Sequence, residues 1–302
     1  MLPAILRSTI VSRALACVAF IGLLSPAFAE AQSAETARSN GGMVSSQQWI
    51  ASQVGADVLA AGGNAVDAAI ATGFALAVTH PSAGNIGGGG FMVVRFPNGQ
   101  TTAVDFREKA PLAAFPEMWI DENGEYSSMI HHRSHMAVGV PGTVAGFDKA
   151  HRLYGRADWH NLLDPAVDLA EDGFELSEAL AGSMERFVGR SQYEATVATF
   201  SKDGSAYAVG ETWRQADLGR TLARIRDDRS DGFYRGETAR LMAAEMVRGG
   251  GMITEEDLDR YEARERSAIT STYRGHDIIG MPPPSSGGVA VATILNILEP
   301  YD

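Results

Sequence analysis

Cysteine is almost absent from this sequence. The one cysteine among 302 residues is Cys17, and it lies in a segment that we expect to be removed on export. A mature chain without cysteine forms no disulfide, offers no thiolate nucleophile and has no cysteine ligand for a metal. An oxidising compartment is therefore tolerated without being required.

The segment that contains this cysteine, residues 1–29, has the pattern of a secretory signal. Arg7 and Arg13 supply a basic start, an apolar stretch follows over 14–24, and Ala27-Phe28-Ala29 fits a small-x-small cleavage site. A membrane anchor is the competing interpretation. The apolar stretch is too short to span a bilayer comfortably, so the sequence favours a cleaved signal.

Neither a basic surface nor a second long apolar run follows the signal. The chain has 25 Lys and Arg against 37 Asp and Glu, a formal net charge of −12, and it shows no basic stripe of the kind that nucleic-acid binding requires. Charge, Gly or Pro interrupts every later apolar stretch, so we expect no membrane contact after signal cleavage. The mature chain should begin near Glu30, with a flexible leader over 30–41 and a folded body over 42–302, in the periplasm or outside the cell.

Three motifs of common enzyme classes are missing as well. The run Gly87–Gly90 has Met92 at the sixth position and leads into a strand pattern, whereas a dinucleotide fingerprint opens a helix. The three histidines within 131–135 lack an HExxH pattern, so we expect a polar loop and no metal. Ser285-Ser286-Gly287-Gly288 lacks the leading glycine of G-x-S-x-G. We predict no cofactor, and we interpret the glycine run as a core turn in which glycine allows positive φ and close backbone approach.

The elements that the sequence does predict are a helix, a hairpin and then a mainly helical middle. Small residues over 65–78 indicate a buried helix that Asn64 can cap. Phe91–Phe96 and Thr101–Phe106 flank a turn-forming Pro97-Asn98-Gly99-Gln100 and predict two strands. Further helices are expected over 49–61, 143–152, 164–171, 215–226, 237–248 and 288–298, a capping box over 254–257, and a strand over 273–280.

Arg107 is the residue that physical reasoning singles out for function. It closes an apolar strand within Asp105-Phe106-Arg107-Glu108-Lys109. A rigid element there can hold a guanidinium at the rim of a pocket for bidentate recognition of a carboxylate. A structural ion pair with Asp105 or Glu108 is the alternative that composition alone favours.

Five blocks, in order along the chain, resemble the gamma-glutamyltransferase family. They are Gly63-Asn64-Ala65-Val66-Asp67-Ala68-Ala69, Pro81-Ser82 with Gly84 through Phe91, Asp105 through Pro111, Gly139 through Gly146, and Met281 through Gly288. Because five ordered blocks cover essentially all of 42–302, the resemblance is specific.

The resemblance implies an α+β fold of the N-terminal nucleophile hydrolase type, a four-layer αββα sandwich of which only the N-terminal portion is expected here. Members of this family cut themselves from a precursor into a large and a small subunit, and residues 42–302 would be a partial large subunit. The newly exposed threonine attacks the γ-amide of glutathione or another γ-glutamyl compound, and water or an acceptor amino acid or peptide resolves the ester. The family arginine that binds the α-carboxylate of the donor matches Arg107.

The family nucleophile is expected beyond the end of this chain. It opens a Thr-Thr-His stretch, whereas the only Thr-Thr pair here, Thr101-Thr102, is followed by Ala103. We therefore assign no catalytic residue within the chain, and we expect the small subunit of the same precursor to supply it and the isolated chain to be inactive. Two alternatives stay open: a related amidase that acts on another acyl group, such as a glutaryl-cephalosporin, and a non-catalytic binding module that retains the fold.

Overall fold

The computed structural model describes residues 38–301. The chain divides into two units, Met1–Asn40 and Gly41–Asp302, and all the helices and strands described below belong to the second unit. The expected signal over 1–29 and most of the leader over 30–41 lie outside the described residues.

The first two helices of the body form where the sequence predicts them. α2 spans Trp49–Ala60. Gly62 follows it with a positive φ of 95°, a conformation that favours glycine, and its N–H donates to the Leu59 carbonyl. α3 spans Ala65–Thr79 and is buried along most of its length. The Asn64 side chain caps α3, and the Asp67 side chain accepts the Asn64 N–H, which completes a capping box.

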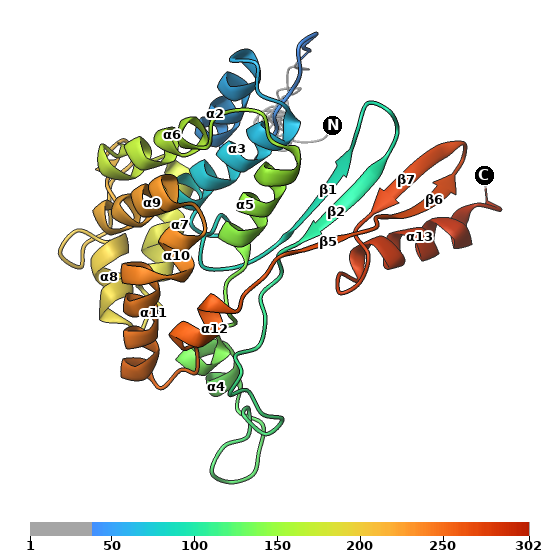
Figure 1. The fold of residues 1–302 in the computed structure, drawn as a ribbon. Helices are drawn as coiled ribbons and strands as arrows, with labels where there is room; N and C mark the ends of the chain where they lie inside the picture. Colours follow the sequence, from blue (N-terminus) through green and yellow to red (C-terminus); the bar gives the residue numbers. More distant parts are fainter. Residues whose placement is uncertain (1–37, 302) are drawn as a thin grey trace, which may run out of the picture. The chain divides into compact units, whose positions relative to one another are not determined.

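The remaining helices cover most of the chain beyond the first hairpin. They are α4 (Ser128–Arg133), the 3-10 helix η1 (His135–Ala137), α5 (Thr143–Tyr154), α6 (Trp159–Glu171), α7 (Glu178–Val188), α8 (Glu194–Phe200), α9 (Ala216–Asp228), α10 (Asp231–Tyr234), α11 (Gly236–Gly249), α12 (Glu255–Asp259) and α13 (Gly287–Leu298). The predicted capping box of α12 is confirmed between Thr254 and Asp257. In Figure 1 the helices from α2 to α11 gather on one side of the first hairpin, and α13 lies along the last one.

Three small antiparallel sheets accompany these helices. The largest has the order β1-β2-β5, from β1 (Phe91–Arg95), β2 (Thr101–Asp105) and β5 (Arg264–Arg266), with Val93 opposite Ala103 and Val104 opposite Glu265. The other two pair β3 (Phe174–Glu175) with β4 (Thr212–Trp213) and β6 (Ile269–Tyr273) with β7 (His276–Gly280). The described residues thus combine helices and antiparallel sheets, as expected for an α+β fold.

Two predictions of local structure need correction. The strand expected over 273–280 is confirmed as β7 over 276–280, but its first residues end β6 and form a turn, with Arg274 at φ 47° and Gly275 at φ 79°. Two consecutive residues with positive φ give the backbone twist that a tight hairpin requires. The polar loop expected around the histidines is α4 and η1, each begun by a serine side chain that accepts a backbone N–H.

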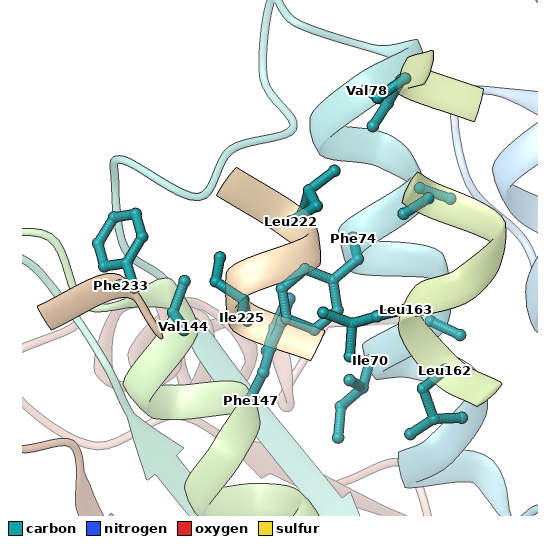
Figure 2. Close-up of a cluster of buried hydrophobic side chains, with 14 of the residues drawn as sticks. Ile70, Phe74, Val78, Val144, Phe147, Leu162, Leu163, Leu222, Ile225 and Phe233 are labelled. Carbon is teal, nitrogen blue, oxygen red and sulfur yellow. The ribbon is translucent and has the colours of Figure 1, made fainter. Parts of the chain in front are cut away.

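The hydrophobic core lies between α3, α5, α6 and α9 (Figure 2). Phe74 of α3 is fully buried and meets Phe147 of α5 edge-on, with ring centroids 5.1 Å apart, and Trp159 of α6 at 5.7 Å. Leu222 and Ile225 of α9 pack against the same cluster from another side. Within residues 38–301, no helix is both apolar enough and long enough to cross a bilayer.

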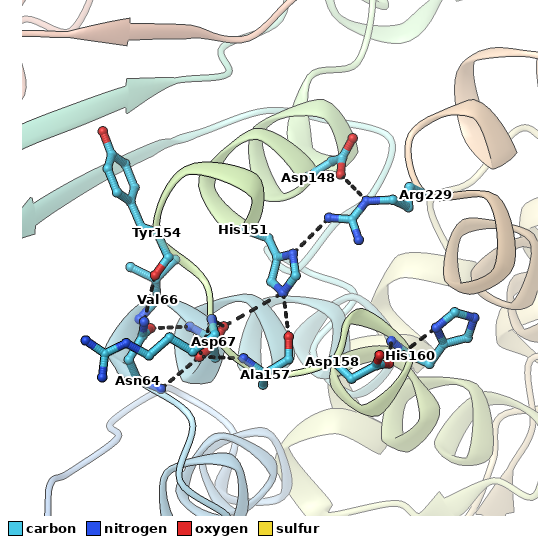
Figure 3. A network of polar contacts seen from close by, with 11 residues as sticks. Asn64, Val66, Asp67, Asp148, His151, Tyr154, Ala157, Asp158, His160 and Arg229 are labelled. Atoms are coloured by element: carbon cyan, nitrogen blue, oxygen red, sulfur yellow. Dashed lines mark hydrogen bonds and ion pairs between the residues drawn. The ribbon is translucent and has the colours of Figure 1, made fainter.

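A buried carboxylate joins the start of α3 to the loop between α5 and α6 (Figure 3). Asp67 has no exposed surface, and its oxygens accept the backbone N–H groups of Asn64 at 2.8 Å, Arg156 at 3.0 Å and Ala157 at 3.2 Å. The imidazole of His151 lies 3.9 Å away. Because Arg156 and Ala157 belong to a segment about 90 residues later, one side chain links the start of α3 to the loop before α6.

Asp67→Asn should lower the free energy of unfolding by about 2–3 kcal/mol, since the amide presents an NH2 group to buried N–H donors and leaves one of them unpaired. Urea unfolding followed by circular dichroism measures the change. Asp57→Asn on the exposed face of α2 is the matched control and should shift stability by less than about 0.5 kcal/mol. Equal losses in the two variants would contradict the role given to Asp67.

Candidate functional site

Arg107 lies immediately beyond the point where the first sheet stops pairing. Phe106 and Gly90 exchange two backbone hydrogen bonds, of 3.1 and 3.2 Å, which extend the pairing of β1 and β2 by one step. No partner strand takes up the backbone of the next residue. Arg107 therefore begins the irregular segment that leaves a rigid element, as the sequence predicts.

Two side chains satisfy the backbone of Arg107, one close in the sequence and one distant. Its N–H donates to Asp105 Oδ1 at 3.1 Å, and its carbonyl accepts from the Tyr261 hydroxyl at 2.8 Å. The other oxygen of Asp105 accepts from Arg266 Nε at 2.7 Å. Asp105 and Tyr261 are 8% and 7% exposed, so both contacts are largely shielded from water and hold the residue firmly.

The guanidinium of Arg107 is exposed, and its Nη1 donates to the Pro284 carbonyl at 3.3 Å. Among the ion pairs of residues 38–301, none joins Arg107 to Asp105 or Glu108. The alternative of a structural ion pair is therefore wrong for Asp105, because that carboxylate pairs with Arg266. A guanidinium has five N–H donors, so this one retains donors for a bidentate contact with a carboxylate.

The neighbouring cation, Lys109, makes its contacts within the protein. Its ammonium donates to the Glu262 carbonyl at 2.8 Å and lies 4.6 Å from the centre of the Tyr261 ring. Burial, and then the nearby charge of Arg264, lower the pKa of Lys109. Of the two cations in this block, Arg107 is thus the one placed to meet an anion from solvent.

The backbone of the glycine run, residues 87–90, passes close to the end of β2 and the start of α5. We call this close contact the crossing. The Gly88 carbonyl accepts the N–H groups of Gly142 at 2.7 Å and Thr143 at 3.1 Å. A Cβ on Gly89 would lie 2.6 Å from the Phe106 carbonyl oxygen. None of the four glycines has a positive φ, so the expectation of close approach is confirmed at this turn and that of positive φ is wrong.

Gly142 serves the same site from the start of α5. A Cβ there would lie 2.1 Å from both the Phe106 carbonyl oxygen and the Tyr261 hydroxyl oxygen. Only glycine leaves room for that hydroxyl to reach the Arg107 carbonyl. Burial raises the pKa of Tyr261, and the charges of Asp105 and Glu108 add to the effect. The phenol therefore remains a protonated donor over the whole physiological range of pH.

The histidine candidates have other partners, whereas the serine motif directly follows Pro284, whose carbonyl accepts from the Arg107 guanidinium. His131 and His132 share contacts with the Tyr126 hydroxyl, whereas His135 bonds to Glu245. Within residues 38–301, no group of three His, Cys, Asp or Glu side chains could hold a metal ion. The Ser285 hydroxyl accepts the Gly287 N–H in the turn before α13.

The Thr101-Thr102 pair lies inside β2, beside an open pocket of about 930 Å³. The Thr102 hydroxyl donates to Glu265 at 2.8 Å, and the Tyr154 hydroxyl donates to the same carboxylate oxygen. These bonds hold the pKa of Glu265 below its usual value. Both threonines are paired with residues of β1, and their rejection as the nucleophile stays a prediction.

Sequence reasoning missed Tyr261 and Arg266. The first contacts Arg107 across 154 positions, and the second contacts Asp105 across 161. No local pattern marks either residue. Arg266 closes a three-residue strand of charged side chains, which lacks the alternation that predicts a strand.

Known proteins with similar sequences and structures share this architecture. Residues 51–302 match the family profile described as gamma-glutamyltranspeptidase. The glutathione hydrolase proenzyme of Escherichia coli (strain K12) is 48% identical over 267 residues, which cover 88% of this chain and 46% of that protein. The crystal structure of Helicobacter pylori gamma-glutamyltranspeptidase has a TM-score of 0.86 at 43% identity and covers 88% of this chain and 77% of that chain.

A cephalosporin acylase from Bacillus halodurans is also similar, with a TM-score of 0.76 at 29% identity over 91% of this chain and 53% of that chain. These likenesses confirm the expected N-terminal nucleophile hydrolase fold of the α+β class. The chain spans about half the length of the curated relatives that it matches, 46% for the Escherichia coli protein. The matched region contains the crossing, the strand end and Arg107, and the chain belongs to the gamma-glutamyltranspeptidase family.

Proposed function

We propose that the complete protein is a gamma-glutamyltransferase and glutathione hydrolase precursor, and that residues 42–302 are part of its large subunit. The observation that carries the proposal is the guanidinium of Arg107, exposed at the end of β2 on a backbone held at both its N–H and its carbonyl. The 48% identical relative is a glutathione hydrolase proenzyme, which supports both the activity and the processing.

In this proposal Arg107 binds the α-carboxylate of a γ-glutamyl donor with two parallel N–H···O bonds. The threonine exposed by self-cleavage attacks the γ-carbonyl carbon, and its α-amino group accepts the hydroxyl proton. The C–N bond breaks, the amine leaves with that proton, and a γ-glutamyl ester remains. Water or the amino group of an acceptor amino acid or peptide then attacks the ester and regenerates the threonine. The role of Arg107 is to fix the donor so that the γ-carbonyl meets the nucleophile.

The proposal includes the partners and the location of the protein. The small subunit of the same precursor supplies the nucleophile, and acceptor amino acids or peptides compete with water for the acyl group. Residues 1–29 act as a signal peptide, which directs the protein to the periplasm or outside the cell. Residues 30–41 are a leader.

Arg107→Ala in the complete precursor should raise the KM for γ-glutamyl-p-nitroanilide by about 10- to 100-fold, because a charge-assisted bidentate contact is lost. Arg107→Lys should fall between this variant and the parent, since an ammonium keeps the charge and loses the fork geometry. Steady-state kinetics of the processed enzyme measure both effects.

Arg95→Ala is the matched control, at an exposed arginine that ends the neighbouring strand β1. Its KM should stay within twofold of the parent. If Arg107→Ala also left KM unchanged, the proposed role of Arg107 would be wrong.

Residues 30–302 expressed alone should fold and release no p-nitroaniline from the same donor, because the nucleophile belongs to the small subunit. Circular dichroism checks that the fragment is folded, and the processed full-length enzyme is the positive control. Turnover by the purified fragment would show that a nucleophile lies within these residues.

An amidase of glutaryl groups is the second candidate, supported by the likeness to the Bacillus halodurans cephalosporin acylase. A glutaryl group also carries a distal carboxylate that Arg107 could bind, but it lacks the α-amino group of a glutamyl donor. We expect the full-length protein to cleave γ-glutamyl-p-nitroanilide at least about tenfold better than glutaryl-p-nitroanilide, as expected when a binding site recognises a polar group by hydrogen bonds. The reverse preference would favour the acylase.

A non-catalytic module that retains the fold is the remaining alternative. The reading frame downstream of the codon for Asp302 decides it, because the proposal requires a Thr-Thr-His stretch there. A complete frame without that stretch would leave binding of γ-glutamyl compounds as the function.

A further inference from the structure

Two hydrogen bonds hold the backbone of Arg107, one to Asp105 two residues earlier and one from Tyr261, 154 residues later. We propose that Tyr261, together with the Asp105–Arg266 pair, positions Arg107 and so sets the selectivity of the site for donors with a free α-carboxylate. The inference rests on the proposed function of Arg107. None of these residues touches the donor in this proposal.

Tyr261 is itself held on several sides. Its ring stacks on that of Tyr234, with centroids 5.7 Å apart and planes within 9°, and the Lys109 ammonium lies 4.6 Å from its centre. Tyr234 in turn donates to the Pro141 carbonyl at 2.9 Å. The hydroxyl that reaches Arg107 is therefore a fixed donor, and the missing Cβ of Gly142 leaves the space for it.

The second contact reaches the other backbone group of the same residue. Arg266 Nε lies 2.7 Å from Asp105 Oδ2, which directs the other oxygen of Asp105 to the Arg107 N–H at 3.1 Å. With both backbone groups held, the direction of the Cα–Cβ bond is set. A rotation of about 10° at Cα would move a guanidinium roughly 6 Å away by about 1 Å, which is enough to impair the binding of a bidentate partner.

The buried phenol keeps this arrangement independent of pH over the working range. Burial raises the pKa of Tyr261, so its hydroxyl stays protonated at neutral pH, where the donor carboxylate is ionised. A loss of selectivity in a variant therefore reports on the missing contact and not on a changed titration.

The test uses the full-length precursor after processing, with kinetic constants expressed per mole of cleaved enzyme. The probes are γ-glutamyl-p-nitroanilide and its α-carboxamide analogue, and the readout is the ratio of their kcat/KM values. Tyr261→Phe removes one hydroxyl and keeps the ring, and it should lower this ratio by about 3- to 30-fold, mainly through the KM of the carboxylate donor.

Tyr234→Phe is the matched control. It removes a buried hydroxyl that also donates to a backbone carbonyl, in the ring stacked on Tyr261, but at Pro141. Its ratio should stay within twofold of the parent. In an Arg107→Ala background, Tyr261→Phe should change the ratio no further, because the group that it positions is gone.

The outcomes separate the two proposals. If Arg107→Ala abolishes the discrimination while Tyr261→Phe behaves like Tyr234→Phe, the positioning role is wrong and the function of Arg107 stands. If Arg107→Ala leaves the ratio unchanged, the proposed role of Arg107 in binding the donor carboxylate is wrong. Should Tyr261→Phe fail to mature, Arg266→Gln releases the other contact from a half-exposed side chain, and an unchanged ratio there overturns the inference.

Discussion

The hydrogen bonds that replace strand pairing at Arg107 are the constraint on which the candidate site depends. The sheet ends at the pair of backbone hydrogen bonds between Phe106 and Gly90. A chain that leaves a sheet normally loses the hydrogen bonds that fix its backbone. Here Asp105 and Tyr261 take the next N–H and carbonyl. The backbone of Arg107 is thereby held by as many hydrogen bonds as a strand residue, while its guanidinium stays in solvent.

Buried aspartates that accept backbone N–H groups recur as joints of this fold. Asp67 accepts N–H groups of the loop between α5 and α6. Asp105 accepts the Arg107 N–H, and Asp257 accepts the Leu112 N–H at 2.6 Å. Each binds a segment that local helix or strand bonds do not satisfy, and charged acceptors make stronger bonds than neutral ones. Removing such a carboxylate therefore leaves buried donors unpaired as well as losing a contact.

Glycine makes these joints possible by letting backbones approach closely. At Gly89 and Gly142 any Cβ would collide with a carbonyl oxygen of the strand end. The crossing brings the start of α5 against the end of β2 and leaves space for Tyr261 behind Arg107. The run of four glycines thus supports the candidate site, because the N–H and carbonyl groups of Gly88 and Gly90 bond to the protein itself.

The sequence alone determined the elements whose signals are local: the capped helices α2 and α3, the hairpin of β1 and β2, and an arginine at the end of a strand. It also carried the family resemblance that the comparisons confirm. Only the tertiary structure decided that Asp105 pairs with Arg266 and leaves Arg107 free, and that Tyr261 holds the Arg107 carbonyl. Those partners lie more than 150 positions away, and no propensity, cap or periodicity within one segment encodes which distant side chain will reach it.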